Sequence, residues 1–528
     1  MRLVIAVAAT LGFVAGFASC ASAATLVYCA PAAPEGFDPA PYVTGATFDA
    51  SSQLFYDRLV EFAPGSTSIV PGLAESWDVS PDGRSYTFHL RQNVHFHTTD
   101  AFAPKRDFSA DDVVFSLSRQ FDRKNPWFGY AGGSWPWFSG LGLDTLIRSI
   151  DKIDATTVRI TLTRADSGFL GDLAMDFASV LSKEYADTLQ REKHQSLLDR
   201  NPVGTGPFVF NHADAGHVYA SANAGYWRGA PKLDTIVFSV TPDAADRLAK
   251  LKSGACQIAP VTDAATLAAL KAEPSIGIAT AVSPDVVYLA FNTARAPFND
   301  VKVRRAVSEA IDRQAIADGI YGGLAEPATR LVPASLAGSD ATVPADTFDT
   351  AAAKQALADA GVTNLNVRLL VTRAPRPYSP DMVGTAGMIV SDLARAGVGA
   401  TVQVAGIGEY LRKSADKAHG EGVIIGWTAA NGDLGSFLSV LMSCDAVARS
   451  NRAEWCDQPF SDLLARARLA QPATAAMLLD QAQHTVADQA PLIPLVHTLT
   501  AVAVTKSVSG YTVDPLGRHN FASVDLAE

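Results

Sequence analysis

Between residues 283 and 428 the chain alternates apolar runs with amphipathic segments, and this alternation constrains the fold more than any other feature of the sequence. Short apolar runs bounded by turn residues are typical of buried strands. Four such runs are DVVYLAFNT, NLNVRLLVT, GATVQVAG and GVIIGW. The segments between them have the period of helices: NDVKVRRAVSEAIDRQAIADGIYGG, DMVGTAGMIVSDLARAG and GEYLRKSADKA. Strands that alternate with helices form βαβ units, so we predict an α/β fold here.

The first of these helical segments is predicted to be one continuous helix that begins near Asn299 or Asp300 and stops at a pair of glycines. Its apolar face consists of Val303, Val307, Ala310 and Ile311.

The residues before about 282 are richer in short strands and turns. SYTFHL (85 to 90) and TVRITL (157 to 162) alternate polar and apolar residues as half-buried strands do. Ser109, followed three residues later by Asp112, is predicted to begin a helix. Gly204 and Gly206 form a turn before a strand, but Pro207 and Phe208 follow where a phosphate-binding helix should open. A dinucleotide-binding loop is therefore disfavoured.

Length and charge narrow the class of protein. A chain of 528 residues, 48% of them hydrophobic, can form two or three lobes, each with a core of its own. A formal charge of -11 argues against a nucleic-acid binder, which usually carries a basic face. The expected partner is a small molecule or another protein.

The N-terminus has the pattern of an export signal. Residues 1–23 contain one Arg, a long apolar segment and then Ala21-Ser22-Ala23, a small-x-small site after which cleavage would leave Ala24 first. The alternative is a lipoprotein that is lipidated at Cys20. No later apolar run reaches the roughly 18 residues that a membrane span needs, so we expect an exported, soluble, periplasmic chain.

Export makes the cysteines candidates for disulfides. Beyond Cys20 the chain has four: Cys29, Cys256, Cys444 and Cys456. Four cysteines in an oxidising compartment allow two disulfides in three connectivities. The short separation of Cys444 and Cys456 favours a local bridge between them, which leaves Cys29 for Cys256. A zinc site is the alternative, but the sequence has no Cys-x-x-Cys pair.

Two loops that follow predicted strands carry a candidate ligand site. TRAPRPYSP brings Arg376 beside Tyr378, and TAANGDLGSF brings Asp433 close after Trp427. Ligands of open α/β sheets bind outside the carboxyl ends of the strands. An acid for an ammonium and an arginine for a carboxylate would suit a short peptide, two residues of which span roughly 7 Å. The alternatives are a surface salt bridge for Arg376, turn chemistry for Asp433, and core or wall positions for the two aromatic residues.

Catalytic patterns are weak. The sequence contains neither a Gly-x-Ser-x-Gly elbow nor a His-Glu-x-x-His motif. His95 and His97 would share one face of a predicted strand, but further metal ligands are not evident, and packing or surface roles are favoured. We therefore expect a binding protein rather than an enzyme, with no metal and no cofactor.

Taken in order, several stretches resemble the periplasmic solute-binding proteins of peptide ABC importers, solute-binding protein family 5. They are TLVYCAPAAPEGFDP, PGLAESWDVSPDGRSYTFHLR, SADDVVFS, NPVGTGPF, GYWRGAPKLDTIVFS, VYLAFNT, VRRAVSEAID and GYTVDPLGRHNF. MDFASVLSKEYAD, RPYSP and GWTAANGD are most similar to the dipeptide-binding group of the family. FDRKNPW and EWCDQPF are more similar to binding proteins for antimicrobial peptides.

The resemblance implies a two-lobed periplasmic binding protein fold of the type II, large peptide-binding class. Lobe I would comprise residues 24–282 with an inserted subdomain at about 68–190, lobe II residues 283–500, and residues 501–528 would return to lobe I. It also implies a monomer that closes on a short peptide, with a dipeptide as the expected ligand of this chain, and delivers it to an inner-membrane ABC permease with ATPase subunits.

Carried over by position, Asp433 would hold the peptide ammonium and Arg376 its carboxylate. Gly45 would lie in main chain that lines the cleft, with Trp427 and Tyr378 near the side-chain pockets. The family's two disulfides match the pairing given above. Ala429-Ala430 and Leu434-Gly435 replace more polar or proline-containing neighbours, which leaves haem or antimicrobial peptides as alternative ligands and an exported hydrolase or chaperone as a more distant alternative.

Overall fold

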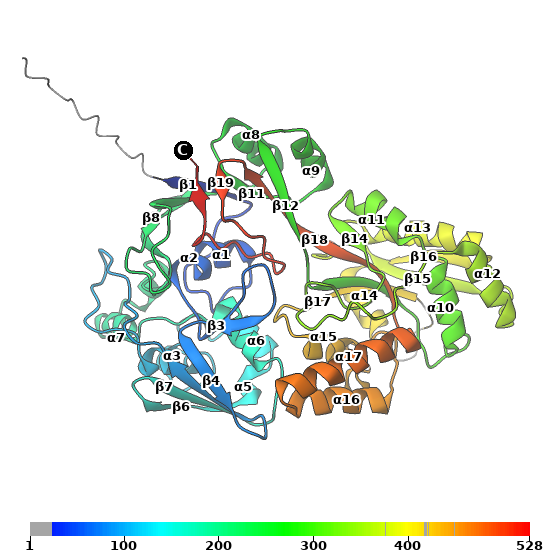
Figure 1. Cartoon of the computed structure of the whole chain (residues 1–528), viewed down its shortest axis with the longest axis horizontal. Coiled ribbons are helices and arrows are strands. Elements are labelled where there is room, and N and C mark those ends of the chain that lie inside the picture. Colours follow the sequence, from blue (N-terminus) through cyan, green and yellow to red (C-terminus); the bar gives the residue numbers. More distant parts are fainter. Residues whose placement is uncertain (1–23, 375, 417–419, 421, 448, 528) are drawn as a thin grey trace, which may run out of the picture.

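The computed structural model describes residues 24–374, 376–416, 420, 422–447 and 449–527. The predicted signal peptide, residues 1–23, lies outside the described residues. The described chain has two large hydrophobic cores, one built from residues between 26 and 258 together with residues 502 to 524, the other from residues 286 to 496. We call the part around the first core lobe I and the part around the second lobe II; they lie side by side in Figure 1.

Lobe II contains the predicted βαβ units. Strand β15 (Asn366–Thr372) is parallel to both β16 (Gly399–Ala405) and β17 (Gly422–Thr428), so their carboxyl ends share one sheet edge. Strand β13 (Asp285–Ala290) is antiparallel to β17. The helices of this lobe are α10 (Val301–Glu309), α11 (Arg313–Tyr321), α12 (Thr350–Asp359), α13 (Met382–Arg395), α14 (Ile407–Ser414), α15 (Leu434–Met442), α16 (Gln458–Leu469) and α17 (Pro472–Gln489).

The helix predicted from Asn299 onward is two helices, and the prediction of one continuous element was wrong. Asp300 caps α10 by accepting from the Lys302 N–H at 2.8 Å. The side chain of Asp312 accepts from the Ala315 N–H at 2.9 Å and so begins α11. The apolar period does not reveal this break, because Ala310 and Ile311, which lie within it, are buried as they would be in one helix.

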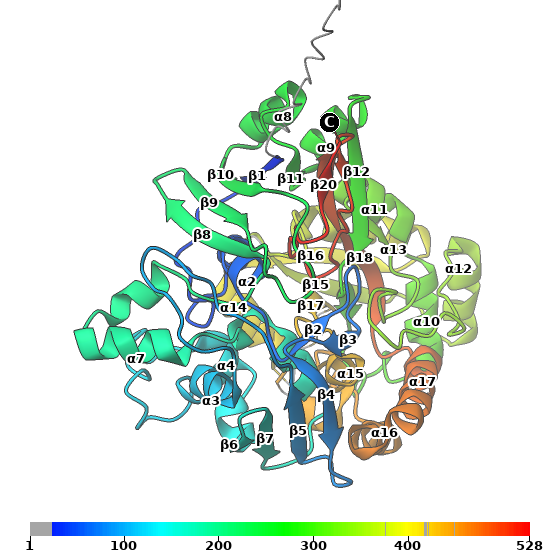
Figure 2. The same cartoon turned by 60° about the vertical axis from the view of Figure 1, so that its left-hand side comes forward.

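Lobe I has a mixed sheet and a separate four-stranded sheet. The first contains β1 (Thr25–Ala30), β8 (Phe208–Ala213), β9 (His217–Ala222), β10 (Thr235–Val240), β11 (Ile258–Pro260) and β12 (Ile276–Val282). The second, at the lower end of Figure 2, has the order β4 (Ala74–Val79), β5 (Ser85–Leu90), β7 (Thr157–Leu162), β6 (Ile147–Asp154). A short hairpin, β2 (Val60–Phe62) and β3 (Ile69–Pro71), precedes the second sheet.

Short helices complete lobe I: α1 (Gly45–Ala50), α2 (Ser52–Phe55), α3 (Ala110–Ser118), α4 (Pro136–Gly140), α5 (Leu143–Leu146), α6 (Phe169–Ala174), α7 (Lys183–Glu192), α8 (Ala244–Ser253) and α9 (Ala264–Lys271). As predicted, α3 starts after Ser109, whose N–H donates to the Asp112 carboxylate at 2.9 Å.

The segment with His95 and His97 is not a strand, so the predicted shared face was wrong. His97 is buried and its Nε2 lies 2.9 Å from the Gly206 carbonyl, whereas His95 is exposed beside Asp107. The backbone here bonds to the turn at Gly204 rather than to a sheet, because the His97 N–H donates to the Gly204 carbonyl at 2.8 Å. The two side chains have separate partners.

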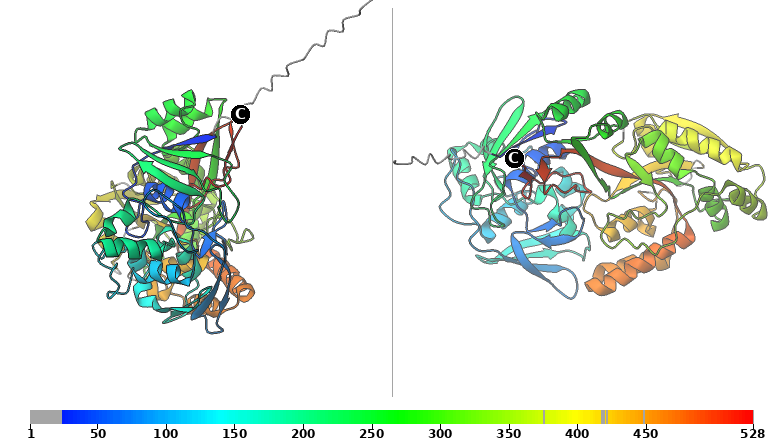
Figure 3. Two further views of the ribbon diagram at one scale, coloured as in Figure 1. Left: turned by 90° about the vertical axis from the view of Figure 1, so that its left-hand side faces the viewer. Right: turned by 45° about the horizontal axis from the view of Figure 1, so that its top comes forward.

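One long strand, β18 (Ile493–Thr505), joins the lobes. It pairs with β13 and β14 (Ala325–Pro327) in lobe II and with β11 and β12 in lobe I. Figure 3 (right) shows it running from one body into the other. Where β12 passes into β13 beside it, the Ser283 N–H donates to the Thr498 carbonyl at 2.8 Å and the Thr498 N–H to the Asp285 carboxylate at 2.9 Å. Two paired segments therefore connect the lobes at this place.

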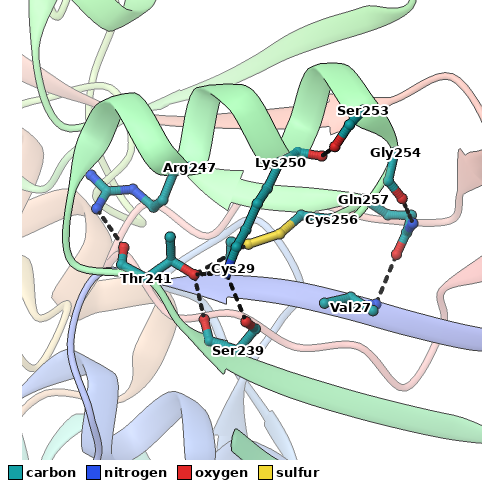
Figure 4. Close-up of a disulfide and its surroundings, with 10 residues drawn as sticks. All are labelled: Val27, Cys29, Ser239, Thr241, Arg247, Lys250, Ser253, Gly254, Cys256 and Gln257. Atoms are coloured by element: carbon teal, nitrogen blue, oxygen red, sulfur yellow. Dashed lines mark hydrogen bonds between the residues drawn. A yellow bond between two sulfur atoms is a disulfide. The ribbon is translucent and has the colours of Figure 1, made fainter. Parts of the chain in front are cut away.

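The cysteines pair as predicted. Cys29 of β1 is bonded to Cys256, with 5.9 Å between the Cα atoms, and Cys444 to Cys456, with 4.5 Å. Figure 4 shows the first bridge beneath α8, next to Thr241, whose hydroxyl accepts from Lys250 at 2.9 Å. Within the described ranges, no helix has the length and apolar character of a membrane span.

Candidate ligand-binding site

Arg376 and Tyr378 form a compact unit after the end of β15. The Arg376 Nε–H donates to the Tyr378 hydroxyl at 3.0 Å, and its guanidinium lies 5.3 Å from the centre of the ring. The ring is buried against Gly426 of β17, where a Cβ would lie 2.5 Å from it. Within the described part of the chain, Arg376 has no carboxylate at salt-bridge distance. The aromatic ring thus orients a guanidinium that remains available to an anion.

Trp427 lies near the end of β17, and the loop with Asp433 follows this strand. Because β15 and β17 are parallel, this loop leaves the sheet at the same edge as the loop with Arg376. Trp427 is 37% exposed, so it is not a core residue. The sequence-based expectation that both loops follow strand ends at one edge is confirmed.

Asp433 caps helix α15. Its carboxylate accepts from the Ser436 N–H at 2.6 Å, so the turn role suggested by the sequence is real. Burial raises the pKa of Asp433, the Ser436 bonds lower it, and the charge of Asp166 raises it again, with a net rise above the ordinary value. A cation beside this half-buried carboxylate would favour its charged form and lower its pKa again.

The loop that carries Asp433 lies against lobe I. The Asn431 side chain donates to the Asp172 carboxylate of α6 at 2.9 Å. Gly432, at φ +63°, lies where a Cβ would be 2.7 Å from Thr67, and a Cβ at Gly435 would be 3.1 Å from the Ser167 hydroxyl. Lobe I therefore contributes to the surroundings of Asp433, through residues more than 250 positions away that no motif in the sequence signalled.

Asp172 should make stability depend on pH. Burial raises its pKa to about 8, although the Asn431 bond lowers it. A carboxyl whose folded pKa exceeds its unfolded value near 4 loses stability as the pH rises between the two. We expect Asp172→Asn to reduce the fall in unfolding free energy between pH 5 and pH 8 by about 1 kcal/mol or more, measured by urea titration. An unchanged pH dependence would contradict this.

Gly45 is the first residue of α1 in lobe I and is exposed, with no atom within 4 Å of a Cβ placed there. Four cavities among the described residues each lie within a single lobe, and none of these four is lined by Gly45, Asp433, Arg376, Tyr378 or Trp427. Lobe II brings Arg376, Tyr378 and Trp427 together at its sheet edge, whereas Gly45 lies in the other lobe.

Residues 68–449 match the sequence model of a protein family, the middle part of the bacterial extracellular solute-binding proteins, family 5. The chain belongs to this family. Over 513 residues it is 42% identical to the dipeptide-binding protein of Escherichia coli (strain K12), covering 96% of each chain. It is 40% identical over 505 residues to heme-binding protein A of Haemophilus influenzae, covering 95% of this chain and 92% of the other.

Two solved structures share the fold of this family member. HbpA2 from Haemophilus parasuis has a TM-score of 0.92 at 36% identity and covers 96% of this chain and 100% of its own. A dipeptide-binding protein from Pseudoalteromonas sp. SM9913 in complex with Met-Leu has a TM-score of 0.68 at 34% identity and covers 95% and 100%. The fold class predicted from the sequence, a two-lobed α/β binding protein, is therefore confirmed.

Proposed function

We propose that this protein captures short peptides, primarily dipeptides, outside the cytoplasm and delivers them to an inner-membrane ABC permease with its ATPase subunits. The observation that carries the proposal is the pair of loops at one edge of the lobe II sheet, one with Arg376, which has no carboxylate partner among the described residues, and one with the half-buried Asp433. The similarity to dipeptide-binding proteins over nearly the whole chain supports it.

In this proposal Asp433 holds the peptide ammonium and Arg376 the carboxylate. Trp427 and Tyr378 form walls for the side chains, and main chain at Gly45 faces the peptide from lobe I. Lobe I comprises residues 24–282 with a subdomain at about 68–190, lobe II residues 283–500, and residues 501–528 return to lobe I. Closure occurs about the paired segments at Ser283 and Thr498.

The protein is further proposed to act as a periplasmic monomer after removal of residues 1–23. N-terminal sequencing of the exported protein is expected to begin at Ala24. Labelling by a lipid precursor would instead identify Cys20 as the first residue of a lipoprotein.

Calorimetric titration of the purified mature protein with a panel of dipeptides tests the main proposal. Saturable binding of several dipeptides, recovered chemically intact, is the expected result. A panel without any binder would reject the proposal, and cleaved peptides would indicate an exported hydrolase instead.

Replacing Arg376 by Met should weaken binding of dipeptides that have a free carboxylate. Hydrogen bonds to charged groups contribute about 1.5 to 3 kcal/mol, so we expect a loss of tenfold or more in affinity. The parent protein should discriminate against dipeptide amides, and Arg376→Met should bind acid and amide equally, as measured by calorimetry. A variant that still preferred the free acid would assign the carboxylate to another residue.

Haem is the second candidate ligand, because one relative, 40% identical over 505 residues, is named heme-binding protein A. A haem titration followed by absorbance distinguishes the two. Haem lacks an ammonium, so its binding should survive Asp433→Asn, whereas dipeptide binding should not.

A further inference from the structure

Lobe I contains a cavity of about 450 Å³ whose walls include none of the residues proposed to hold the peptide. Its walls come from α2 and the segment after it, the β2–β3 hairpin, residues 226 to 232 and residues 512 to 523. All of these segments belong to lobe I. The volume is within the range of roughly 300 to 1,000 Å³ that is typical of small-molecule sites.

The guanidinium of Arg58 is the unusual group in this cavity. Its side chain is only 6% exposed, and neither Nε nor Nη1 has a hydrogen-bond partner in the described chain. The nearest acid is Asp176, whose carboxylate is 4.0 Å from Nη1 and accepts from Gln53 at 2.7 Å and from the Ser52 hydroxyl. Asp176 therefore balances the charge of Arg58 without satisfying its donors, and buried donors without acceptors are unfavourable.

The acids that line the cavity are all occupied by other groups. Asp57 accepts from Thr205 at 2.7 Å and from Tyr226 and Trp227 at 2.9 Å. Glu61 pairs with Arg228 at 2.9 Å. Among the described contacts, neither carboxylate bonds to the guanidinium of Arg58, although both line the same cavity.

A second guanidinium faces the same space. Arg518 pairs with Asp514 through Nη2 at 2.6 Å and lies 4.5 Å over the ring of Phe62, but its Nε has no partner in the described residues. Planar guanidinium groups with free donors match the oxygens of carboxylates and phosphates.

We propose that this cavity binds a small oxyanion, a carboxylate or a phosphate, through the free donors of Arg58 with support from Arg518. This proposal does not depend on the proposed function. The anion would satisfy the donors that Asp176 leaves unbonded, and it would tie the segment after α2 to the C-terminal segment of the chain.

Thermal unfolding of the mature protein in sodium acetate, sodium phosphate and sodium chloride at equal ionic strength tests the proposal. We expect acetate or phosphate to raise the unfolding midpoint in a saturable way, and the more effective anion identifies the class. Arg58→Met should abolish this response. Arg58→Lys, which keeps the charge but not the planar pair of donors, should lower the affinity for the anion tenfold or more. Arg106→Met, which removes an arginine of lobe I that is paired with Asp112 at 2.6 Å outside the cavity, is the matched control and should keep the response.

Two results would overturn the proposal. One is the lack of a specific anion effect, seen either as an equal response of the parent protein and Arg58→Met to acetate or phosphate, or as an equal response of the parent protein to chloride. The other is a parallel loss of dipeptide binding in Arg58→Met, which would make the cavity part of the peptide site. Should Arg58→Met fail to fold, crystals of the parent protein soaked in sodium selenate give a direct answer: anomalous density at Arg58 supports the site, and water alone there rejects it.

Discussion

Replacing Asp433 by Asn is expected to weaken dipeptide binding by about 2 to 5 kcal/mol, the cost of removing one partner from a desolvated charge pair. Asparagine is chosen because Asp433 also caps α15, and Asn is an equally good cap. The substitution therefore removes the charge and keeps the bond to the Ser436 N–H. Calorimetry with a dipeptide bound by the parent protein measures the effect.

The matched control is Asp457→Asn. Asp457 caps α16 in the same lobe by accepting from the Phe460 N–H at 2.8 Å, in the same way that Asp433 caps α15. This control should bind dipeptides as the parent protein does, with a similar small change in stability. If Asp433→Asn bound as tightly as the control, Asp433 would be a helix cap and nothing more.

Replacing Asp38 by Ala should destabilise the protein by about 3 to 5 kcal/mol, because it leaves a buried charge without its partner. Asp38 and Arg119 are both fully buried, and their two parallel hydrogen bonds measure 2.6 and 2.7 Å. The guanidinium also lies 5.2 Å over Trp135. The pair connects the loop before Gly45 to the end of α3. Urea unfolding at pH 7 measures the loss.

A surface pair provides the comparison. Lys183 and Asp187 lie one helical turn apart on α7 with side chains 40% exposed, and Asp187→Ala should cost about 0.3 to 0.5 kcal/mol. Equal losses for Asp38→Ala and Asp187→Ala would mean that water or another side chain compensates Arg119.

The fold was predictable from the sequence where local pattern decides it. The strands at 366–372, 399–405 and 422–428 and the helix start at Asp381 follow from apolar runs and caps. The break at Asp312 was not predictable from period alone, because the Asp312 N–H also donates to Asp392 of α13, a contact 80 residues away. The backbone near His97 likewise bonds to the distant turn at Gly204, so its alternating polar and apolar residues do not form a strand.

The candidate site was predictable only in its lobe II half. Strand-end position and residue chemistry indicated Arg376 and Asp433, and the parallel pairing of β15 with β17 accounts for their common edge. Asp166 and Asp172 could not be found in this way, because only the packing of α6 against the loop at Asn431 brings them near Asp433. Arg58 lies in the buried segment between α2 and β2, and no sequence motif marks its guanidinium as lacking hydrogen-bond partners among the described residues.

The pairing of β18 has a consequence for the order of folding during synthesis. Lobe I begins at residue 24, yet β11 and β12 complete their hydrogen bonding only with residues 499 to 505 of β18. A ribosome or an export channel releases the chain from its N-terminus. The sheet of lobe I therefore cannot complete its strand pairing until lobe II and β18 have emerged. A polypeptide that ends before residue 499 would lack this strand partner. Its exposed sheet edge would carry unpaired N–H and C=O groups that can pair with other chains.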